Sequence, residues 1–145
     1  MIKATYNEVL NAKTALTRLD SFFGIQREGA IEKPVERPAE YKSGVVLKMA
    51  ILHNRLDCVV KDYAKARERI RAQIAGEDHV IPEKDVVRNT RFSGEVNDLL
   101  QQNVEIDAAP LTLEDLDLER NRHAPSAIGA LGPFLSNMAP TSTRS

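Results

Sequence analysis

Apolar side chains alternate between spacings of three and four residues from residue 44 to residue 75, the most regular pattern in the sequence. The average spacing of about 3.5 residues places them all on one face of a helix, as in coiled coils. We therefore predict a helix over about residues 44–75, roughly 45 Å long at about 1.5 Å per residue, with Gly76 at its end. The apolar stripe consists of Val45, Met49, Leu52, Leu56, Val59, Tyr63, Ala66 and Ile70.

A second helical pattern begins near the N-terminus. Thr5 stands three residues before Glu8, which is the spacing of a capping box. Apolar residues at helical spacing follow, so the pattern predicts a helix over residues 5–23 that Gly24 terminates. Its apolar face would hold Val9, Ala12, Leu16, Leu19 and Phe23.

Residues 24–44 lack this periodicity. Gly29, Pro34 and Pro38 occur there among alternating charges, and proline disfavours both helices and central strands. We interpret this segment as a long connecting loop, of the kind that is either functional or mobile.

Shorter elements are predicted beyond Gly76. Asp85 is a candidate cap for a third helix, and residues 104–107 alternate between apolar and acidic side chains as in a short strand. Thr112 precedes Asp115 by three residues, which predicts one further helical turn. The third helix would bury Phe92, Val96 and Leu99.

The composition changes at residue 123 to alanine, proline and serine, so we divide the chain into a helical domain, 1–122, and a tail, 123–145. Such a tail buries too little apolar surface to order itself. Its apolar residues lie near helical spacing, with Met138 as the last of them, and Pro133 could open a final turn. We expect either a docking peptide or an unanchored tail, and the candidate anchors are Ile128, Leu131, Phe134 and Leu135.

Together these elements predict an all-α fold: a long, coiled-coil-like antiparallel helical hairpin with a third helix, a short extended segment and an irregular C-terminal tail. The first helix is too short to cover the whole stripe of the long helix. We therefore expect a homo-oligomer, with a three-helix monomer whose loop covers the stripe as the alternative. The predicted oligomer seam comprises Val45, Met49, Leu52, Leu56, Val59, Tyr63 and Ile70.

Composition limits the class of protein. The 145 residues include 20 basic and 21 acidic side chains, for a net charge of −1, and 42% are hydrophobic. This balance excludes a strongly basic nucleic-acid coat. We expect one small soluble domain without a signal peptide or membrane span, because the most apolar run, residues 45–52, is short and contains Lys48. The single cysteine, Cys58, cannot form an internal disulfide, which favours a reducing compartment.

Charge is unevenly distributed within this balance. The long helix carries seven basic and three acidic residues, whereas eight acidic residues and no basic one lie between Arg91 and Arg120. These segments could pack together or stay solvated. Lys61, Lys65 and Arg69 form a basic ridge that could bind a nucleic-acid backbone or a small anion. Neither ligand is the favoured interpretation of this ridge, and for nucleic acid the aromatic residues that would stack on bases are missing.

No group of residues indicates catalysis. The sequence has no glycine-rich phosphate loop and no metal-binding or nucleophile motif. His53, His79 and His123 are scattered, and Cys58 has no histidine at a spacing that would activate it. We therefore predict no catalytic residue, no metal site and no cofactor.

The segments MAILHNRLDCVVKDYAKARERI and FSGEVNDLLQQNVEIDAAPLTLEDL resemble the small helical proteins of uncharacterised function encoded by tailed bacteriophages. The resemblance covers about residues 40–118, and its closest part runs from Leu99-Leu100 through Val104–Ile106 to Leu111–Leu116. It implies a phage origin, a role in assembling or decorating the particle, and a location in the host cytoplasm or the virion. It implies no catalytic residue.

We therefore expect a non-enzymatic, virion-associated or morphogenesis protein that binds itself and other phage or host proteins through the seam and the tail. The alternative is a soluble phage inhibitor that binds a host protein, nucleic acid or a small anionic ligand through Lys61, Lys65 and Arg69.

Overall fold

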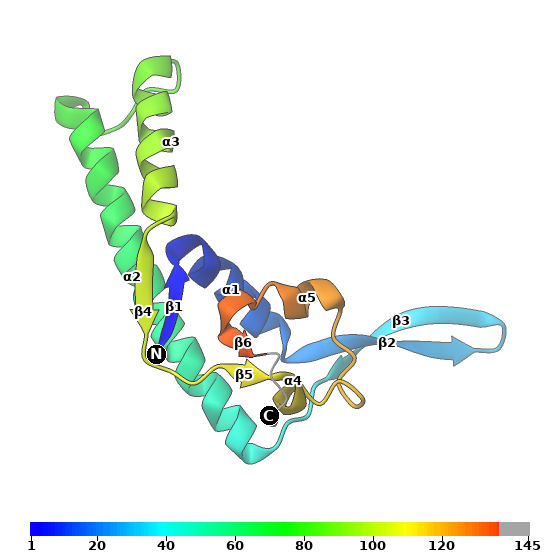
Figure 1. Ribbon diagram of the computed structural model, residues 1–145. Coiled ribbons are helices and arrows are strands. Elements are labelled where there is room, and N and C mark those ends of the chain that lie inside the picture. Colours follow the sequence, from blue (N-terminus) through cyan, green and yellow to red (C-terminus); the bar gives the residue numbers. More distant parts are fainter. Residues whose placement is uncertain (137–145) are drawn as a thin grey trace.

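The computed structural model describes residues 1–136. A compact body carries two arms that leave it in different directions (Figure 1). One arm is helical and the other is a β-hairpin. The helices are α1 (Tyr6–Arg18), α2 (Ser43–Ala75), α3 (Val86–Leu100), α4 (Leu113–Leu116) and α5 (Pro125–Gly129), with 3-10 turns η1 (Gly76–Asp78) and η2 (Gly132–Phe134). The strands are β1 (Ile2–Thr5), β2 (Ser21–Glu28), β3 (Ile31–Pro38), β4 (Asn103–Ile106), β5 (Leu111–Thr112) and β6 (Leu135–Ser136).

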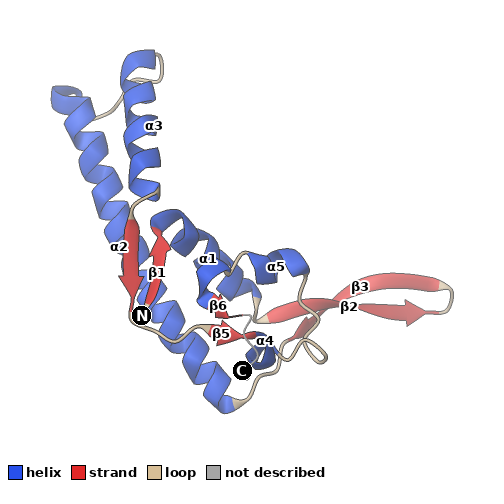
Figure 2. Ribbon diagram, in the orientation of Figure 1, coloured by secondary structure: helices blue, strands red, loops and turns tan. Residues whose placement is uncertain are grey.

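The prediction of an all-α fold is wrong. Of residues 1–136, 56% are helical and 21% lie in strands, and the strands of this range form three separate pairs (Figure 2). β1 pairs with β4 and β2 with β3, both antiparallel, while β5 and β6 are parallel. Each pair joins segments through backbone hydrogen bonds, and helical periodicity in the sequence carries no information about such pairing.

The long helix has nearly its predicted bounds. α2 runs from Ser43 to Ala75, and Gly76 ends it with a φ of 59° that favours glycine. α3 packs antiparallel against the C-terminal half of α2 to form the helical arm (Figure 1). The guanidinium of Arg67 in α2 lies 5.2 Å from the centre of the Phe92 ring in α3, a cation–π contact within this arm.

The predicted caps are confirmed. Thr5 and Glu8 bond reciprocally, with distances of 2.9 Å and 3.2 Å between the paired backbone nitrogens and side-chain oxygens. The Asp85 carboxylate accepts a hydrogen bond from the Arg88 backbone N–H, and Thr112 forms a second capping box with Asp115. Capping acts over three residues, so the local sequence is sufficient to encode it.

The first helix ends earlier than predicted. α1 stops at Arg18 with Leu19 as its C-cap, and Phe23 and Gly24 belong to β2 rather than to the helix. The run Ser21-Phe22-Phe23-Gly24-Ile25 is rich in the aromatic and β-branched residues that favour strands. Leu19 itself is fully buried, so the helical stripe of α1 reaches the core before the chain turns.

One hydrophobic core holds the body together. It lies between α1, the N-terminal half of α2, the β1–β4 pair and the segment 111–134. Its largest fully buried side chains are Phe134, Leu19, Leu52, Leu56, Ile106, Leu111, Leu116, Leu131 and Val9. The helical tip and the β-hairpin both lie outside this core.

Candidate functional site

The segment predicted to be a loop is a regular β-hairpin, and that prediction is wrong. β2 and β3 pair over eight residues each, from Ser21↔Pro38 at the base to Glu28↔Ile31 at the tip. The two-residue loop between them begins with Gly29 at a φ of 64°. Glycine at the first loop position fits a type II′ turn, whose twist matches that of the strands.

The hairpin accommodates both prolines because of the alternation of its hydrogen bonds. The residues that flank a two-residue loop form a hydrogen-bonded pair, and bonded and non-bonded pairs alternate from there. Ile25↔Pro34 and Ser21↔Pro38 are therefore non-bonded pairs, in which the backbone N–H points away from the partner strand. Consistent with this alternation, the Ala39 N–H donates to the Asp20 carbonyl one step beyond the base, at 2.8 Å. Proline thus removes no hydrogen bond from this ladder.

Large apolar side chains of the hairpin remain in solvent. Phe23 and Ile25 are each 69% exposed and Ile31 is 67% exposed. Phe23, Ile25 and Pro34 share one face, because side chains of directly opposed residues lie on the same side of an antiparallel pair. A two-stranded hairpin is at best marginally stable in water by itself, and exposed apolar patches mark interaction sites.

Polar contacts border this apolar face at both ends. At the tip, Arg27 and Glu32 form an ion pair with 2.8 Å between nitrogen and oxygen. At the base, the Ser21 hydroxyl donates to the Glu36 carboxylate at 3.0 Å. We call Phe23, Ile25 and Pro34, with these flanking groups, the arm face.

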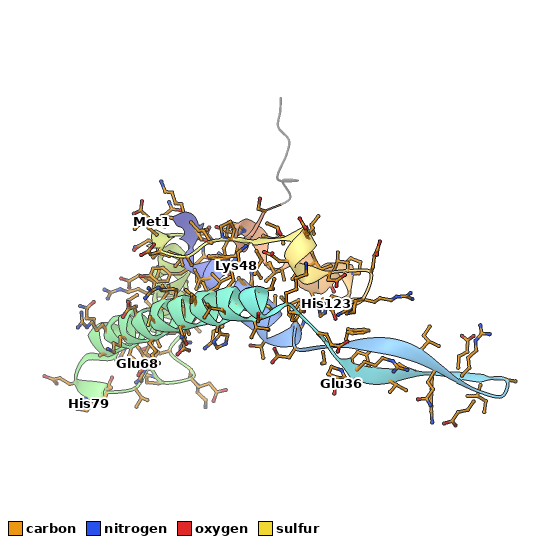
Figure 3. All side chains as sticks on the ribbon, turned by 90° about the horizontal axis from the view of Figure 1, so that it is seen from below. Met1, Glu36, Lys48, Glu68, His79 and His123 are labelled. Carbon is orange, nitrogen blue, oxygen red and sulfur yellow. The ribbon has the colours of Figure 1, made fainter. Side chains whose placement is uncertain are left out.

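His123 and Tyr41 anchor the base of the hairpin to the body. The Tyr41 hydroxyl donates to the Leu19 carbonyl at 2.7 Å, and His123 Nε2 lies 2.6 Å from the same hydroxyl oxygen. The His123 ring also stacks on Tyr41 and meets the Phe22 ring edge-on. Figure 3 places His123 where the body meets the hairpin that carries Glu36.

This anchor changes the proton affinity of both rings. Burial raises the pKa of Tyr41 to about 12, and the negative charge of Asp20 adds to that effect. Burial also lowers the pKa of His123, and a hydrogen bond to the backbone of Ser21 opposes part of this shift. The folded state thus favours a neutral imidazole at the hairpin base.

Asn121 provides a second anchor. Its side chain is completely buried, accepts a hydrogen bond from the Glu40 N–H at 2.9 Å and donates to the carbonyls of Glu40 and Leu116. These three hydrogen bonds satisfy the polar atoms of the buried Asn121 side chain, as a buried amide requires. The hairpin therefore projects from a base that is held at Asn121 and at His123.

An open hollow of about 780 Å³ lies beside this base. Its lining combines the rings of Phe22 and Phe23 with the basic side chains of Arg18 and Arg122. The apolar surface of the arm face thus continues toward the body at Phe23.

The predicted seam residues lie mainly inside the monomer. Met49, Leu52 and Leu56 are buried, and Val45 and Val59 pack partly buried against the same core. Tyr63 meets the Tyr6 ring at a centroid distance of 5.9 Å, and Ile70 is half-buried. Since this chain's own elements cover the stripe, an exposed seam no longer supplies a reason for oligomerisation.

The predicted tail anchors also lie against the chain itself. Leu131 and Phe134 are fully buried in the core, and Ile128 and Leu135 pack against it. Leu135 pairs with Leu111 in the parallel β5–β6 pair. Residues 123–136 therefore share the core of the helical region, while Met138 lies outside the described residues.

The predicted basic ridge is on the surface of α2. Lys61 forms an ion pair with Asp57 at 3.3 Å, and Lys13 Nζ contacts the same carboxylate at 2.8 Å. The hydrogen bond from Lys13 is the main cause of a lowered pKa at Asp57. Lys65 and Arg69 are exposed. Of the acidic residues between Arg91 and Arg120, Asp115 pairs at 2.6 Å with Lys48, nearer the N-terminal end of α2.

The structure does not bring the candidate metal-ligating and nucleophilic residues together. His79 lies at the far end of the long helix from the hairpin (Figure 3), and Cys58 is exposed. Within residues 1–136, no three histidine, cysteine or acidic side chains are grouped as a metal site would require. In the same range, no helix is long and apolar enough to cross a membrane.

The hairpin is the feature that sequence reasoning missed. Its signals were present: Phe23 and Ile25 alternate with Gly24 and Gln26, and Gly29-Ala30 divides two segments of equal length. The prolines and the alternating charges outweighed these signals, since they are usual in loops.

Comparisons with protein-family models, with curated protein sequences and with solved structures find no match for this chain. Its function is therefore argued from the geometry.

Proposed function

We propose that this chain is a non-enzymatic interaction protein, a component of a larger assembly, which binds its partners through the projecting β2–β3 hairpin. The observation that carries the proposal is the exposure of Phe23, Ile25 and Ile31 on an arm that is firmly anchored but lies outside the core. The phage proteins that the sequence resembles imply the same kind of role, in the host cytoplasm or the virion.

The anchored base of the hairpin supports a role in binding. The base is held by the contacts of His123, Tyr41 and Asn121, so the arm is presented in a defined direction. Preorganisation of this kind lowers the entropic cost of association. The apolar centre with a charged border also has the composition of an interaction surface.

Site-specific photo-cross-linking tests this function. A photoreactive phenylalanine analogue at position 23 changes the side chain little, and it would lie within reach of any protein bound to the arm face. We expect irradiation of cells that produce this protein to give one discrete cross-linked adduct. The mass of the adduct identifies the bound partner. The same analogue at Thr90, an exposed position on α3, serves as the control.

A discrete adduct from position 23 but not from position 90 supports the hairpin as the binding element. The absence of any adduct from position 23, with the protein folded and abundant, would overturn the proposal.

A further inference from the structure

The two outer edges of the hairpin are unequal. On β2, the backbone groups that point away from the hairpin belong to Ser21, Phe23, Ile25 and Arg27, as the alternation of bonded pairs requires. On β3, the corresponding residues are Glu32, Pro34, Glu36 and Pro38. Prolines lack the N–H that an added strand would need, and prolines and charges are the usual means of blocking strand addition. The β3 edge is therefore closed, whereas β2 has no proline.

Part of the β2 edge is already occupied at its base. A hydrogen bond joins the backbone of Ser21, at the base of this edge, to His123. Beyond it, the backbone groups of Phe23, Ile25 and Arg27 make no backbone hydrogen bond within the described part of the chain. The open edge thus consists of these three residues.

A second copy of this chain fits that edge. If two β2 strands pair antiparallel about a twofold axis at Ile25, then Ile25 faces Ile25 and Phe23 faces Arg27 of the other copy. This register uses the three free residues and avoids Ser21. Each such pair exchanges two N–H···O bonds, and the closed β3 edges end the sheet at four strands.

Side chains on the arm face agree with this register. The centre would be a continuous apolar row, in which Pro34 and Ile25 of one copy meet Ile25 and Pro34 of the other. Beside this centre, Arg27 of one copy would lie over the Phe23 ring of the other copy. The Arg27 guanidinium would then stand between Glu32 of the same copy and Glu36 of the other copy. Opposite charges and a cation–π contact therefore flank an apolar centre.

We propose that two copies of this protein dimerise by pairing their β2 edges at Phe23, Ile25 and Arg27 into a four-stranded antiparallel sheet. This inference rests on the proposed function and names the partner as a second copy. Because the interface is isologous and both outer edges are blocked, the assembly closes at two chains.

Sedimentation equilibrium of the full chain provides the test. We expect the wild-type chain to have twice its 16.1 kDa monomer mass. Ile25→Pro should be monomeric, because it removes an outward N–H at the centre of the edge while leaving the β2–β3 ladder unchanged. Circular dichroism and urea unfolding would show that the body remains folded.

Ile25→Val serves as the matched control, because it trims the same side chain while keeping the backbone donor. It should remain dimeric. A dimer that persists in Ile25→Pro, or one that Ile25→Val dissociates equally, would overturn the pairing of β2 edges.

Disulfide trapping tests the register, with Cys58 replaced by serine. Ile25→Cys would place two cysteines on the axis, about 5.5 Å apart between Cα atoms, within the range that a disulfide spans. Phe23→Cys would leave its cysteines about 13 Å apart along the strand. We expect cross-linking only from position 25, and cross-linking from both positions or from neither would contradict the inference.

The outcomes separate this inference from the function on which it rests. A monomeric wild-type chain whose position 23 cross-links to a different protein would overturn the dimer and leave the interaction function intact. If position 23 gives no adduct at all, both the dimer and the interaction function are overturned.

Discussion

His123 joins segments that are far apart in the sequence. It contacts Tyr41 after the hairpin and Phe22 within it, while residues 131–134 beyond it fill the core. A histidine that appears isolated along the chain therefore has a structural role in three dimensions. Its surroundings also make the anchor sensitive to pH.

We expect the free energy of unfolding to decrease as the pH falls below about 6.5, the ordinary pKa of histidine. Burial lowers the pKa of His123 in the folded state, so the unfolded chain binds the proton more readily. The stabilisation is complete above the unfolded pKa and is lost as the pH falls toward the folded one. Urea unfolding at about pH 7 and about pH 5.5 measures this change.

His123→Gln should flatten this pH dependence, because the titrating group is gone. His79→Gln is the matched control, since His79 is exposed in a turn and has no comparable packing. Equal pH dependence in the wild type and in His123→Gln would refute the assignment.

At the scale of elements, the hairpin behaves as an appendage to a complete core. Phe22↔Arg37 is a hydrogen-bonded pair of the same kind as Glu28↔Ile31, the pair that the loop joins now. The Gly29-Ala30 loop can therefore connect Phe22 directly to Arg37. This excision removes residues 23–28 and 31–36 without touching His123 or Tyr41.

We expect the shortened chain to unfold cooperatively, with a free energy of unfolding within about 1 kcal/mol of the wild type, because the removed residues contribute nothing to the buried core. It should also sediment as a monomer. Loss of cooperative unfolding, measured by circular dichroism in urea, would show instead that the hairpin is part of the folding unit.

At the scale of the whole molecule, the apolar stripe of α2 and the C-terminal segment complete one core. Leu56 comes from the long helix and Phe134 from the tail, and both are fully buried. Packing within one chain therefore explains the heptad pattern of α2 without an intermolecular seam. It predicts that a charged residue in the stripe unfolds the chain and does not merely dissociate an oligomer.

Leu56→Asp should unfold the chain, because truncating a buried leucine already costs about 2–5 kcal/mol and a buried carboxylate costs more. Leu47→Asp should leave the fold intact, since Leu47 is exposed on the same helix. Helicity by circular dichroism and mass by sedimentation distinguish the cases. A folded Leu56→Asp chain with an altered association state would revive the seam as an intermolecular contact.

Local interactions explain which elements could be predicted. The caps at Thr5, Asp85 and Thr112, the extent of α2 and the strand near residue 104 depend on residues a few positions apart. Each of these was readable from the sequence because hydrogen bonds and periodicity within one segment encode it.

Tertiary structure decided what covers each apolar face and which faces stay open. Leu131 and Phe134 enter the core from a segment whose composition suggested a tail, and Phe23 and Ile25 remain exposed in a segment whose prolines suggested a loop. Burial depends on contacts between residues distant in the chain, and no local pattern carries that information. The unequal edges of the hairpin, and with them the proposed interface, arise from strand register, which only pairing in space creates.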